Sequence, residues 1–363
     1  MRIAIYTIAL NEERFAQRFM ECSRAADLIL VADSGSTDRT TEIIQDNGGR
    51  VCPIRVCPWR FDIARNTALS MLPRDIDLGV ALDLDEVLID GWRDMLEARF
   101  RPGEHQRVRF RYVHSYREDG SYGTIGRKEF IHARDGYQGR YPVHEKVFWV
   151  GPGEEQKVDI PDLLVEHRQD RSKSRASYLS LLELACQEPV ASARHLFWLG
   201  REYIYAGRWC DAIETLERFL AADAIWVVEE AFAHLLLAEA CEAQKRFDLA
   251  RRHLLIATQF LPQHREPWLA LAQFNVRRQE WSQAYLATKQ ALSINYRPQH
   301  YLIRENCWSW QPHDLAALAA FKLGDRSASR AHLEAALRIA PNRLDLLEKS
   351  RRLASAESPT RTS

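Results

Sequence analysis

Apolar runs and helix-forming stretches alternate through the first third of the chain. The apolar runs lie at residues 3–10, 28–32, 51–56 and 78–82. They are continuous, which is typical of parallel strands that are buried on both faces. Helix-forming stretches follow the first three runs, at residues 11–26, 40–47 and 59–69. This order predicts an α/β domain with a mainly parallel sheet and helices on its faces.

The pattern changes after Trp92. Residues 108–116 alternate arginine with apolar side chains, which predicts a strand with one polar face. The arginines expected on that polar face are Arg107, Arg109 and Arg111. Asp119-Gly120 predicts a hairpin turn, and residues 130–150 are typical of further short strands.

From about Ala193 the chain has a helical pattern that repeats. A small residue recurs at Ala212, Ala250 and Ala284, so that successive members stand 38 and 34 residues apart (250 − 212 and 284 − 250). The tetratricopeptide period is about 34 residues, and units of this kind stack into one continuous core. A coiled coil is the alternative, but no heptad is sustained across the proline and glycine breaks. The pattern predicts an all-α, tetratricopeptide-like solenoid.

The balance of charges narrows the range of partners. Lys and Arg together number 50, Asp and Glu together number 50, and the isoelectric point is about 7.2. A protein that binds bare phosphate backbones usually has a basic face and a high isoelectric point. No apolar run reaches the roughly 18 residues of a transmembrane helix, and the seven cysteines are scattered without a Cys-x-x-Cys pair. We therefore expect a cytoplasmic protein with reduced thiols and no integral membrane association.

Carboxylates interrupt the apolar stretch at residues 80–88. Asp83, Asp85 and Glu86 follow the fourth strand directly, and ligands of open α/β sheets bind beyond the carboxyl ends of the strands. Two aspartates at positions i and i+2 can share a divalent cation, or one can hold a ribose while the other holds the ion. A solvated turn after a strand is the alternative interpretation.

Five short motifs occur in order along the first 167 residues. They are Leu10-Asn11-Glu12-Glu13, Asp33-Ser34-Gly35-Ser36-Thr37-Asp38, Ala64-Arg65-Asn66, Asp83-Leu84-Asp85-Glu86 and Val143-His144-Glu145. In this order and placement they resemble the family 2 glycosyltransferases of the GT-A fold, one branch of which carries tetratricopeptide repeats. No Gly-x-Gly-x-x-Gly follows the first strand, which argues against a dinucleotide-binding domain.

The resemblance implies roles for particular residues. The residues implied to bind a nucleotide-sugar are Leu10, Glu12, Asp33, Ser34, Arg65 and Asp83. Those implied to hold Mn²⁺ or Mg²⁺ are Asp83, Asp85 and His167. Glu145 is the implied catalytic base, with His144 and Asp119 as rivals. For Arg65, Glu145 and His167, a surface or structural role is the alternative.

The resemblance further implies a metal-dependent and inverting glycosyltransferase that uses a nucleotide-diphosphate sugar, by default a UDP-sugar. The acceptor stays open among a glycan, a protein or peptide, and a modified base in DNA. The repeats would bind that acceptor or form a homodimer. The alternative function is a tetratricopeptide scaffold with a vestigial transferase domain. The expected parts are a GT-A domain at 1–170, a linking helix or loop at 171–192, helical repeats at 193–341 and a helix with a disordered tail at 342–363.

Overall fold

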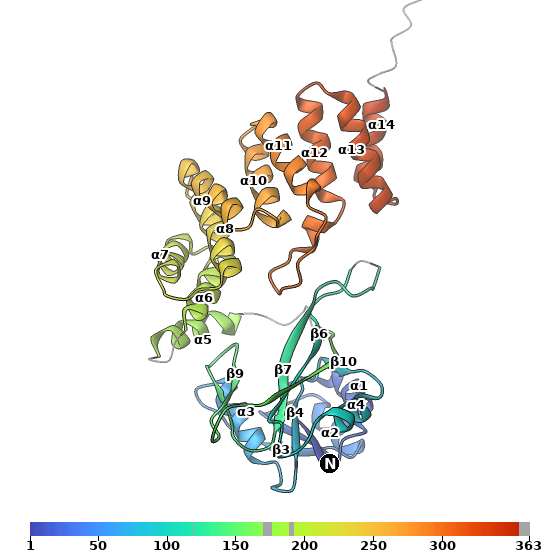
Figure 1. The fold of residues 1–363 in the computed structure, drawn as a ribbon, viewed down its shortest axis with the longest axis vertical. Coiled ribbons are helices and arrows are strands. Elements are labelled where there is room, and N and C mark those ends of the chain that lie inside the picture. The colour runs from blue at the N-terminus through green and yellow to red at the C-terminus, as the bar shows by residue number, and fades with distance from the viewer. Residues whose placement is uncertain (118, 170–175, 189–191, 356–363) are drawn as a thin grey trace, which may run out of the picture. The chain divides into compact units, whose positions relative to one another are not determined.

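The chain divides into two compact units, Met1–Ala191 and Ser192–Ser363. The computed structural model shown in Figure 1 describes residues 1–117, 119–169, 176–188 and 192–355. The predicted disordered tail after residue 355 and much of the predicted linker lie outside the described residues. The four predicted boundaries therefore stay predictions.

A mixed sheet forms the centre of the first unit. Its strands are β1 (Ile3–Ala9), β2 (Leu28–Asp33), β3 (Arg50–Pro53), β4 (Leu78–Ala81), β5 (Glu86–Leu88), β6 (Arg107–Val113), β7 (Ile125–Ala133) and β10 (Lys157–His167). Among the described residues, their order is β3-β2-β1-β4-β7-β6-β10-β5. The part from β3 to β4 is parallel, as the apolar runs predict, but β7 is antiparallel to both of its neighbours. In the second half only β6 and β10 are parallel, so the prediction of a mainly parallel sheet holds fully only for the first half.

Helices cover both faces of the parallel half. They are α1 (Glu13–Ser23), α2 (Thr40–Asp46), α3 (Phe61–Ser70) and α4 (Trp92–Arg99). Ile3 and Ile5 of β1 belong to the core that includes α1 and α4, whereas Ala4 and Tyr6 belong to the core on the α3 side. Successive side chains of a strand point to opposite faces, so burial on both faces requires a continuous apolar run.

Strand β6 explains why the alternating arginines differ from one another. Arg109 is partly exposed and Arg111 is exposed, as predicted, but Arg107 is only 8% exposed. Arg107 pairs with Glu155 at 2.5 Å and lies over the ring of Tyr137. The prediction that Arg107 faces polar surroundings is wrong, because the alternation does not show that a carboxylate and an aromatic ring come to meet it. A short two-stranded sheet, β8 (Tyr137–Arg140) with β9 (Lys146–Trp149), supplies that ring.

The second unit is built of antiparallel helix pairs, as the repeat pattern predicts. The first helices of the pairs are α6 (Ala193–Tyr205), α8 (Val227–Ala243), α10 (Arg265–Arg277) and α12 (Gln311–Lys322). The second helices are α7 (Trp209–Leu220), α9 (Phe247–Phe260), α11 (Trp281–Ser293) and α13 (Arg326–Ile339), and α14 (Leu344–Ser355) follows them. A further helix, α5 (Ala176–Gln187), belongs to the first unit.

Small residues set the distance between paired helices. Ala212, Ala250 and Ala284 are fully buried, and each is the fourth residue of its second helix. Ser329 takes the same place in α13 and is 2% exposed. Gly200 of α6 extends this close packing, because a Cβ atom there would lie 2.5 Å from Cγ of Leu216.

Each first helix ends on a residue in the left-handed conformation. These residues are Gly207, Lys245, Gln279 and Gly324, with φ of 69°, 60°, 59° and 87°. The next amide then donates to a carbonyl five residues back, for example Arg246 N to Cys241 O at 2.8 Å. This is the Schellman ending, which satisfies carbonyls that the helix leaves free.

Histidines are paired within the repeats. Nδ1 of His234 lies 2.9 Å from Nδ1 of His253, and His313 pairs in the same way with His332 at 3.3 Å. Burial and, after it, the charge of the neighbouring His253 lower the pKa of His234 to about 4. These rings are therefore neutral in the folded chain at neutral pH.

We predict opposite effects for two substitutions at equivalent helix ends. Gly207→Ala places a Cβ atom in the left-handed region and should destabilise the chain by about 1–2 kcal/mol. Lys245→Gly removes the same strain and should stabilise it by about 0.5–1 kcal/mol, part of the relief being lost to the larger backbone entropy of glycine. Urea unfolding followed by far-UV circular dichroism measures both. Lys245→Ala is the control and should leave stability near wild type, because it keeps the strain.

Acid should destabilise the repeats through the paired histidines. The pKa of His234 is lower in the folded state than the ordinary value of 6.5. The unfolded chain therefore binds more protons below that value, and stability is lost as the pH falls from about 6.5 towards 4. Replacing His234 and His253 together by leucine should remove about 1 kcal/mol of the stability difference between pH 7 and pH 5, since the rings are partly solvated. An unchanged slope of stability against pH in the double variant would contradict this.

Candidate functional site

A tight turn presents the carboxylates that follow β4. Leu82 and Leu84 are buried at 2% exposure, whereas the side chain of Asp83 is 43% exposed. The turn is closed at both ends, because Glu86 N donates to Asp83 O at 3.0 Å and Asp83 N donates to Glu86 Oε2 at 2.9 Å. The alternation of buried leucines with carboxylates therefore places Asp83 and Asp85 at the carboxyl end of the strand, as predicted.

Arg65 joins two of the predicted site residues. This residue of α3 contacts Oδ1 of Asp83 and Oε1 of Glu145, each at 2.5 Å. Only 15% of its side chain is exposed, and the same holds for Glu145. Burial opposes the charge of Asp83, but the attraction of Arg65 outweighs burial and lowers the pKa of that carboxyl. Arg65 therefore bridges two carboxylates, and the three side chains together keep one negative charge.

Asp85 and His167 form a second contact. Nε2 of His167 lies 3.2 Å from Oδ2 of Asp85, and the backbone N–H of Arg168 donates to Asp85 O at 2.8 Å. Strand β10 places His167 here, because it pairs with β5 in a register that puts His167 opposite Glu86. Burial opposes protonation of His167, but the hydrogen bond and charge of Asp85 outweigh burial and raise its pKa.

Glu86, Tyr112, His114 and Lys128 complete this end of the sheet, and the motifs assigned none of them a role. The hydroxyl of Tyr112 donates to Oε1 of Glu86 at 2.5 Å. Burial and the charge of Asp83 raise the pKa of Glu86 to about 7. Burial, and after it the charge of Lys128, lower the pKa of His114 to about 4. The alternation along β6 is the signal that could have found Tyr112 and His114, since residues 112 and 114 share a face.

The residues that end β1 and β2 are occupied by their own loop. Oδ2 of Asp33 accepts from the backbone N–H groups of Gly35 and Ser36, each at 3.0 Å. The hydroxyl of Ser34 donates to Ala9 O at 2.9 Å. Leu10 is 52% exposed, and Glu12 N donates to Thr40 Oγ1 at 2.7 Å. These residues lie at the same edge of the sheet as Asp83, but the polar groups of Asp33 and Ser34 stabilise a turn.

His144 and Asp119, the rivals of Glu145, lie in different surroundings. His144 has a positive φ of 52°, and its ring centroid lies 5.8 Å from that of Tyr178 on α5. Asp119 lies in the hairpin between β6 and β7, where its Oδ1 accepts from the N–H of Ser121 at 2.9 Å. The structure brings neither side chain to Asp83 or Asp85 through a contact seen among the described residues.

The donor set fits a divalent cation in part. Asp85 and His167 are adjacent oxygen and nitrogen ligands of the kind that Mn²⁺ accepts. Asp83 is already paired with Arg65, so it is not an additional free ligand. Across the described residues, no group of three or more His, Cys, Asp or Glu side chains could hold a metal ion. A cation here would need water or a ligand phosphate for its remaining positions.

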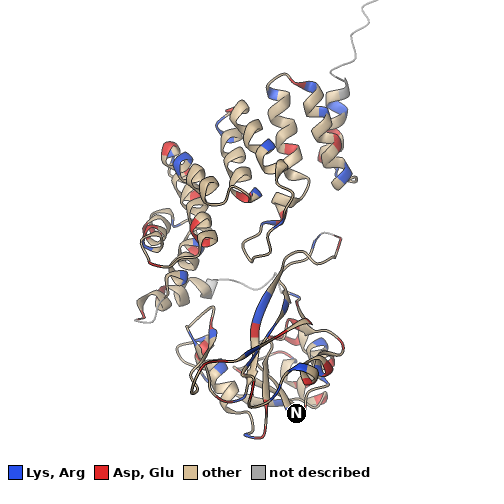
Figure 2. Cartoon of the chain, viewed as in Figure 1, with Lys and Arg blue, Asp and Glu red and all other residues tan. Residues whose placement is uncertain are grey.

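A few carboxylates pair with the basic residues near this edge. Glu129 is shared by Arg107, Arg109 and Lys157, and Asp159 is shared by Arg109 and Arg127. Figure 2 shows acidic residues among the basic ones along these strands. The pairing therefore reduces the positive charge of these strands without removing it.

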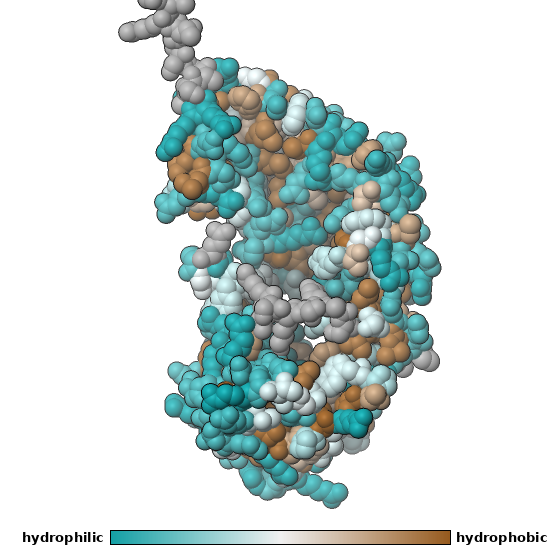
Figure 3. Space-filling view, turned by 180° about the vertical axis from the view of Figure 1, so that it is seen from behind, coloured by the Kyte–Doolittle hydropathy of each residue, from teal (hydrophilic) through white to brown (hydrophobic). Residues whose placement is uncertain are grey.

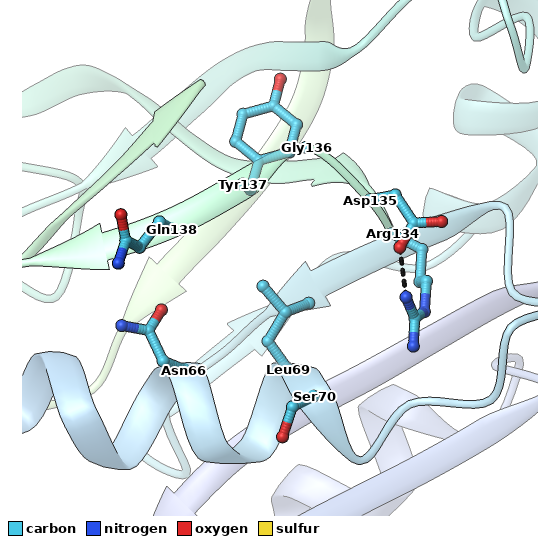
Figure 4. Close-up of a pocket in the computed structure, with 8 residues that line it drawn as sticks. All are labelled: Asn66, Leu69, Ser70, Arg134, Asp135, Gly136, Tyr137 and Gln138. Carbon is cyan, nitrogen blue, oxygen red and sulfur yellow. Dashed lines mark hydrogen bonds and ion pairs between the residues drawn. The ribbon is translucent and has the colours of Figure 1, made fainter. Parts of the chain in front are cut away.

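A separate cavity of about 300 Å³ lies between α3 and the start of β8. It is lined by Asn66, Leu69, Ser70, Arg134, Asp135, Gly136, Tyr137 and Gln138 (Figure 4). None of the predicted site residues lines it. Arg134 donates to Leu72 O at 2.9 Å and pairs with Asp135, and Asn66 is bound to the backbone of Gly139, so these polar groups serve the fold.

Comparison with known proteins finds helical-repeat structures. No family model and no curated protein matches this chain. A solved thermophilic TPR protein from Thermus thermophilus is 21% identical, with a TM-score of 0.37, and the match covers 49% of this chain and 89% of that one. MamA is 19% identical with a TM-score of 0.37, covering 48% and 89%. PilW, a type IV pilus biogenesis factor, is 18% identical with a TM-score of 0.39, covering 47% and 72%.

The interpretation as a family 2 glycosyltransferase is therefore wrong. No model of that family matches the chain, and none of the three structures named above is described as a transferase. The prediction of an enzyme rested on that interpretation and is wrong for the same reason. The catalytic roles given to Glu145 and His144 depended on it as well. The GT-A identity of the first unit is not confirmed either, and what stands is a mixed-sheet domain followed by helical repeats. Every helix in the described part of the chain is too short or too polar to cross a membrane.

We predict that Arg65 stabilises the first unit strongly. Arg65→Ala leaves the buried Glu145 without its partner, and breaking a buried pair in this way costs about 3 kcal/mol. The measurement is the free energy of unfolding in urea. The control is Arg39→Ala, which breaks an exposed pair with Glu42 and should leave stability unchanged. If the two substitutions lowered the free energy of unfolding equally, the buried group would contribute no more stability than an exposed ion pair.

Proposed function

We propose that this protein is a scaffold whose repeat unit binds a segment of a protein partner. The observation that carries the proposal is the inner face of the repeats. First helices of neighbouring pairs contact one another, α6 with α8, α8 with α10 and α10 with α12. Within the described residues, second helices contact each other less. The stack therefore curves with its first helices inside, and such concave surfaces are the usual binding faces of solenoids.

Helix α6 lines this inner face with alternating aromatic and basic side chains. Arg194, Trp198, Arg201 and Tyr205 follow one another at helical spacing and so share a face. The guanidinium of Arg201 lies 3.9 Å from the ring centroid of Trp198 and 5.7 Å from that of Tyr205. Tyr205 is 63% exposed, whereas Trp198 is 9% exposed and packs against Tyr301. Aromatic and arginine side chains are the types most enriched at protein interfaces, so this stripe supports a protein partner.

Apolar surface elsewhere on the repeats is more scattered. Figure 3 shows hydrophobic side chains between hydrophilic ones on one face of the molecule. Leu286 of α11 is 65% exposed and Ile339 of α13 is 52% exposed, and both belong to second helices. Single exposed apolar residues are normal for a protein surface, so these positions serve as controls.

A photo-crosslinking experiment tests the scaffold proposal. Benzoylphenylalanine is placed in the full-length chain at position 205 on the inner face, or at position 286 on a second helix. After irradiation in cells, we expect a discrete crosslinked partner from position 205 and not from position 286. Arg201→Glu should abolish that product by reversing the charge of the stripe.

Equal crosslinking from both positions, or none from position 205, contradicts the proposal. A product with the mass of two copies of this chain would identify the predicted homodimer as the assembly. That product would still place the interface on the inner face.

We propose, second, that the sheet edge at Asp83, Asp85 and His167 binds a nucleoside diphosphate together with Mn²⁺ or Mg²⁺. The adjacent Asp85 and His167 favour this, because they offer two ligands and leave the remaining positions to phosphate oxygens. The bound cation would neutralise the diphosphate. Arg65 lies beside the site and has the planar guanidinium that suits phosphate, although Asp83 and Glu145 now hold it.

Thermal melting of the full chain tests this second proposal without an activity assay. UDP, GDP, CMP and dTDP are each added with and without Mn²⁺. We expect one of them to raise the melting temperature by about 2 °C or more only when the metal is present. Asp85→Asn should abolish the shift, whereas Asp75→Asn, at an exposed aspartate paired with Arg2, should keep it. No shift with any combination contradicts the proposal.

A further inference from the structure

The segment between α11 and α12 crosses the inner face of the repeats. We call residues 294–310 the strap, and it includes the 3-10 helix η1 (Glu305–Trp308). The ring centroid of Tyr301 lies 5.2 Å from that of Trp198 on α6 and 6.0 Å from that of Trp226 at the start of α8. The strap therefore returns from the third helix pair to the first.

Tyr301 occupies an aromatic cage that also holds a cation and a buried acceptor. The guanidinium of Arg194 lies 5.0 Å from the Tyr301 ring centroid. The Tyr301 hydroxyl donates to Oε1 of Glu229, and the same oxygen forms an ion pair with Nε of Arg194 at 3.0 Å. Glu229 is only 5% exposed. The cage therefore contacts both the ring and the hydroxyl of Tyr301, which favours tyrosine over phenylalanine at this position.

A second carboxylate holds the other end of the strap. Oε1 of Glu266 on α10 accepts from the backbone N–H of Arg304 and from Nε1 of Trp308, each at 3.2 Å. Glu266 is 1% exposed, and among the described residues its other carboxylate oxygen has no hydrogen-bond partner. Arg265 lies over Trp308 at 4.2 Å. The strap is therefore anchored at two acidic points.

Between these anchors the strap presents His300. Its ring packs against Trp226 at 5.6 Å and Phe232 at 6.2 Å, and it stacks on His264 at 5.3 Å. All these partners lie at or near the starts of the first helices α8 and α10. The strap thus crosses the inner ends of α10, α8 and α6 in turn, as a bound peptide would.

One end of the strap is built into the repeats and the other is not. Other helix pairs are joined by the short connections 221–226 and 261–264, whereas the strap is much longer. Cys307 and Trp310 are buried, and Trp310 packs in one core with residues of α12, α13 and α14. Tyr296 near the start of the strap is 72% exposed. Displacement of the strap is therefore confined to residues 295–304, and a competing segment would have to cover the surface that Leu302 and Ile303 bury.

We propose that the inner ends of α6, α8 and α10 form a groove for an extended partner segment that carries a tyrosine followed by apolar residues. The strap holds this groove in the free chain. The chemistry of the occupant follows from the resident one, in which the Tyr301 hydroxyl donates to Glu229 and the next two residues, Leu302 and Ile303, are buried. This inference rests on the proposed scaffold function and adds the partner's chemistry and a competing segment of the chain itself.

The test uses the strap's own sequence as the probe. A fluorescent peptide of residues 295–304, Asn-Tyr-Arg-Pro-Gln-His-Tyr-Leu-Ile-Arg, is titrated into the full-length chain and followed by anisotropy. In the wild type the strap competes at an effective concentration of about a millimolar. Tyr301→Ala empties the cage, so we expect it to bind the peptide at least about tenfold more tightly than the wild type does.

Three controls separate recognition from loss of structure. A peptide with alanine in place of its second tyrosine should not bind Tyr301→Ala. Tyr296→Ala changes an exposed tyrosine of the same strap and should behave as the wild type. Tyr301→Phe removes only the hydroxyl that Glu229 accepts, so it should bind the peptide more tightly than the wild type even if Tyr301→Ala does not fold.

The proposal is overturned if the peptide binds the wild type, Tyr301→Ala and Tyr301→Phe equally. It is also overturned if the peptide binds none of these three chains while far-UV circular dichroism shows that they are folded. A wild-type dimer that Tyr301→Ala dissociates also overturns it, because the strap would then be exchanged between copies. These failures differ from failure of the scaffold function. In that case crosslinking from position 205 gives no partner even though the peptide exchanges with the strap.

Discussion

The close approach of paired helices is the constraint on which the repeat unit depends. Ala212, Ala250, Ala284 and Ser329 are buried where each second helix meets its first helix, and a larger side chain would push the helices apart. The first helices then lie next to one another along the inside of the stack. Their inner ends form a continuous surface, and the strap lies on it. The small residues therefore set the distance between paired helices, this distance sets the curvature of the stack, and the curvature forms the surface that the strap covers.

At the edge of the mixed sheet the constraint is electrostatic, because the charged side chains there already have partners within the chain. Arg65 pairs with both Asp83 and Glu145, Asp85 lies against His167, and Tyr112 donates to Glu86. A ligand at this edge must therefore displace or extend contacts that already exist. For the ligand proposed at this edge, the strength of these internal pairs sets how much binding free energy the ligand must supply in exchange.

Local sequence patterns predicted the elements better than their assembly. The continuous apolar run of β1 and the regularly spaced small residues follow from burial and helix packing, so the parallel strands and the helix pairs could be predicted. The antiparallel β7 between β4 and β6 could not, because strand order depends on distant contacts. For the same reason the burial of Arg107 against Glu155 was missed. The carboxylates after β4 were found from their position, but Tyr112 and Lys128 come from strands whose place in the sheet was unknown.

The sequence motifs also led to a prediction of glycosyltransferase function that the comparisons contradict. Asp33 and Ser34 match a binding motif in sequence, yet both stabilise a turn through their own loop. For the strap, by contrast, the sequence contains no sign of a role that the structure shows. Tyr301 is an ordinary residue of an insertion in the sequence, and its importance lies in contacts with α6 and α8, about 70 to 100 residues away, which no local pattern encodes.

Hydrogen exchange of the strap tests the central claim, that the chain covers its own inner face. The amide of Arg304 donates to the buried Glu266, and Tyr301 is held in its cage. We expect amides of residues 301–304 in the wild type to exchange at least about tenfold more slowly than those of the free peptide, and Tyr301→Ala to abolish most of that protection. Exchange at the rate of the free peptide in the folded wild type would contradict this claim.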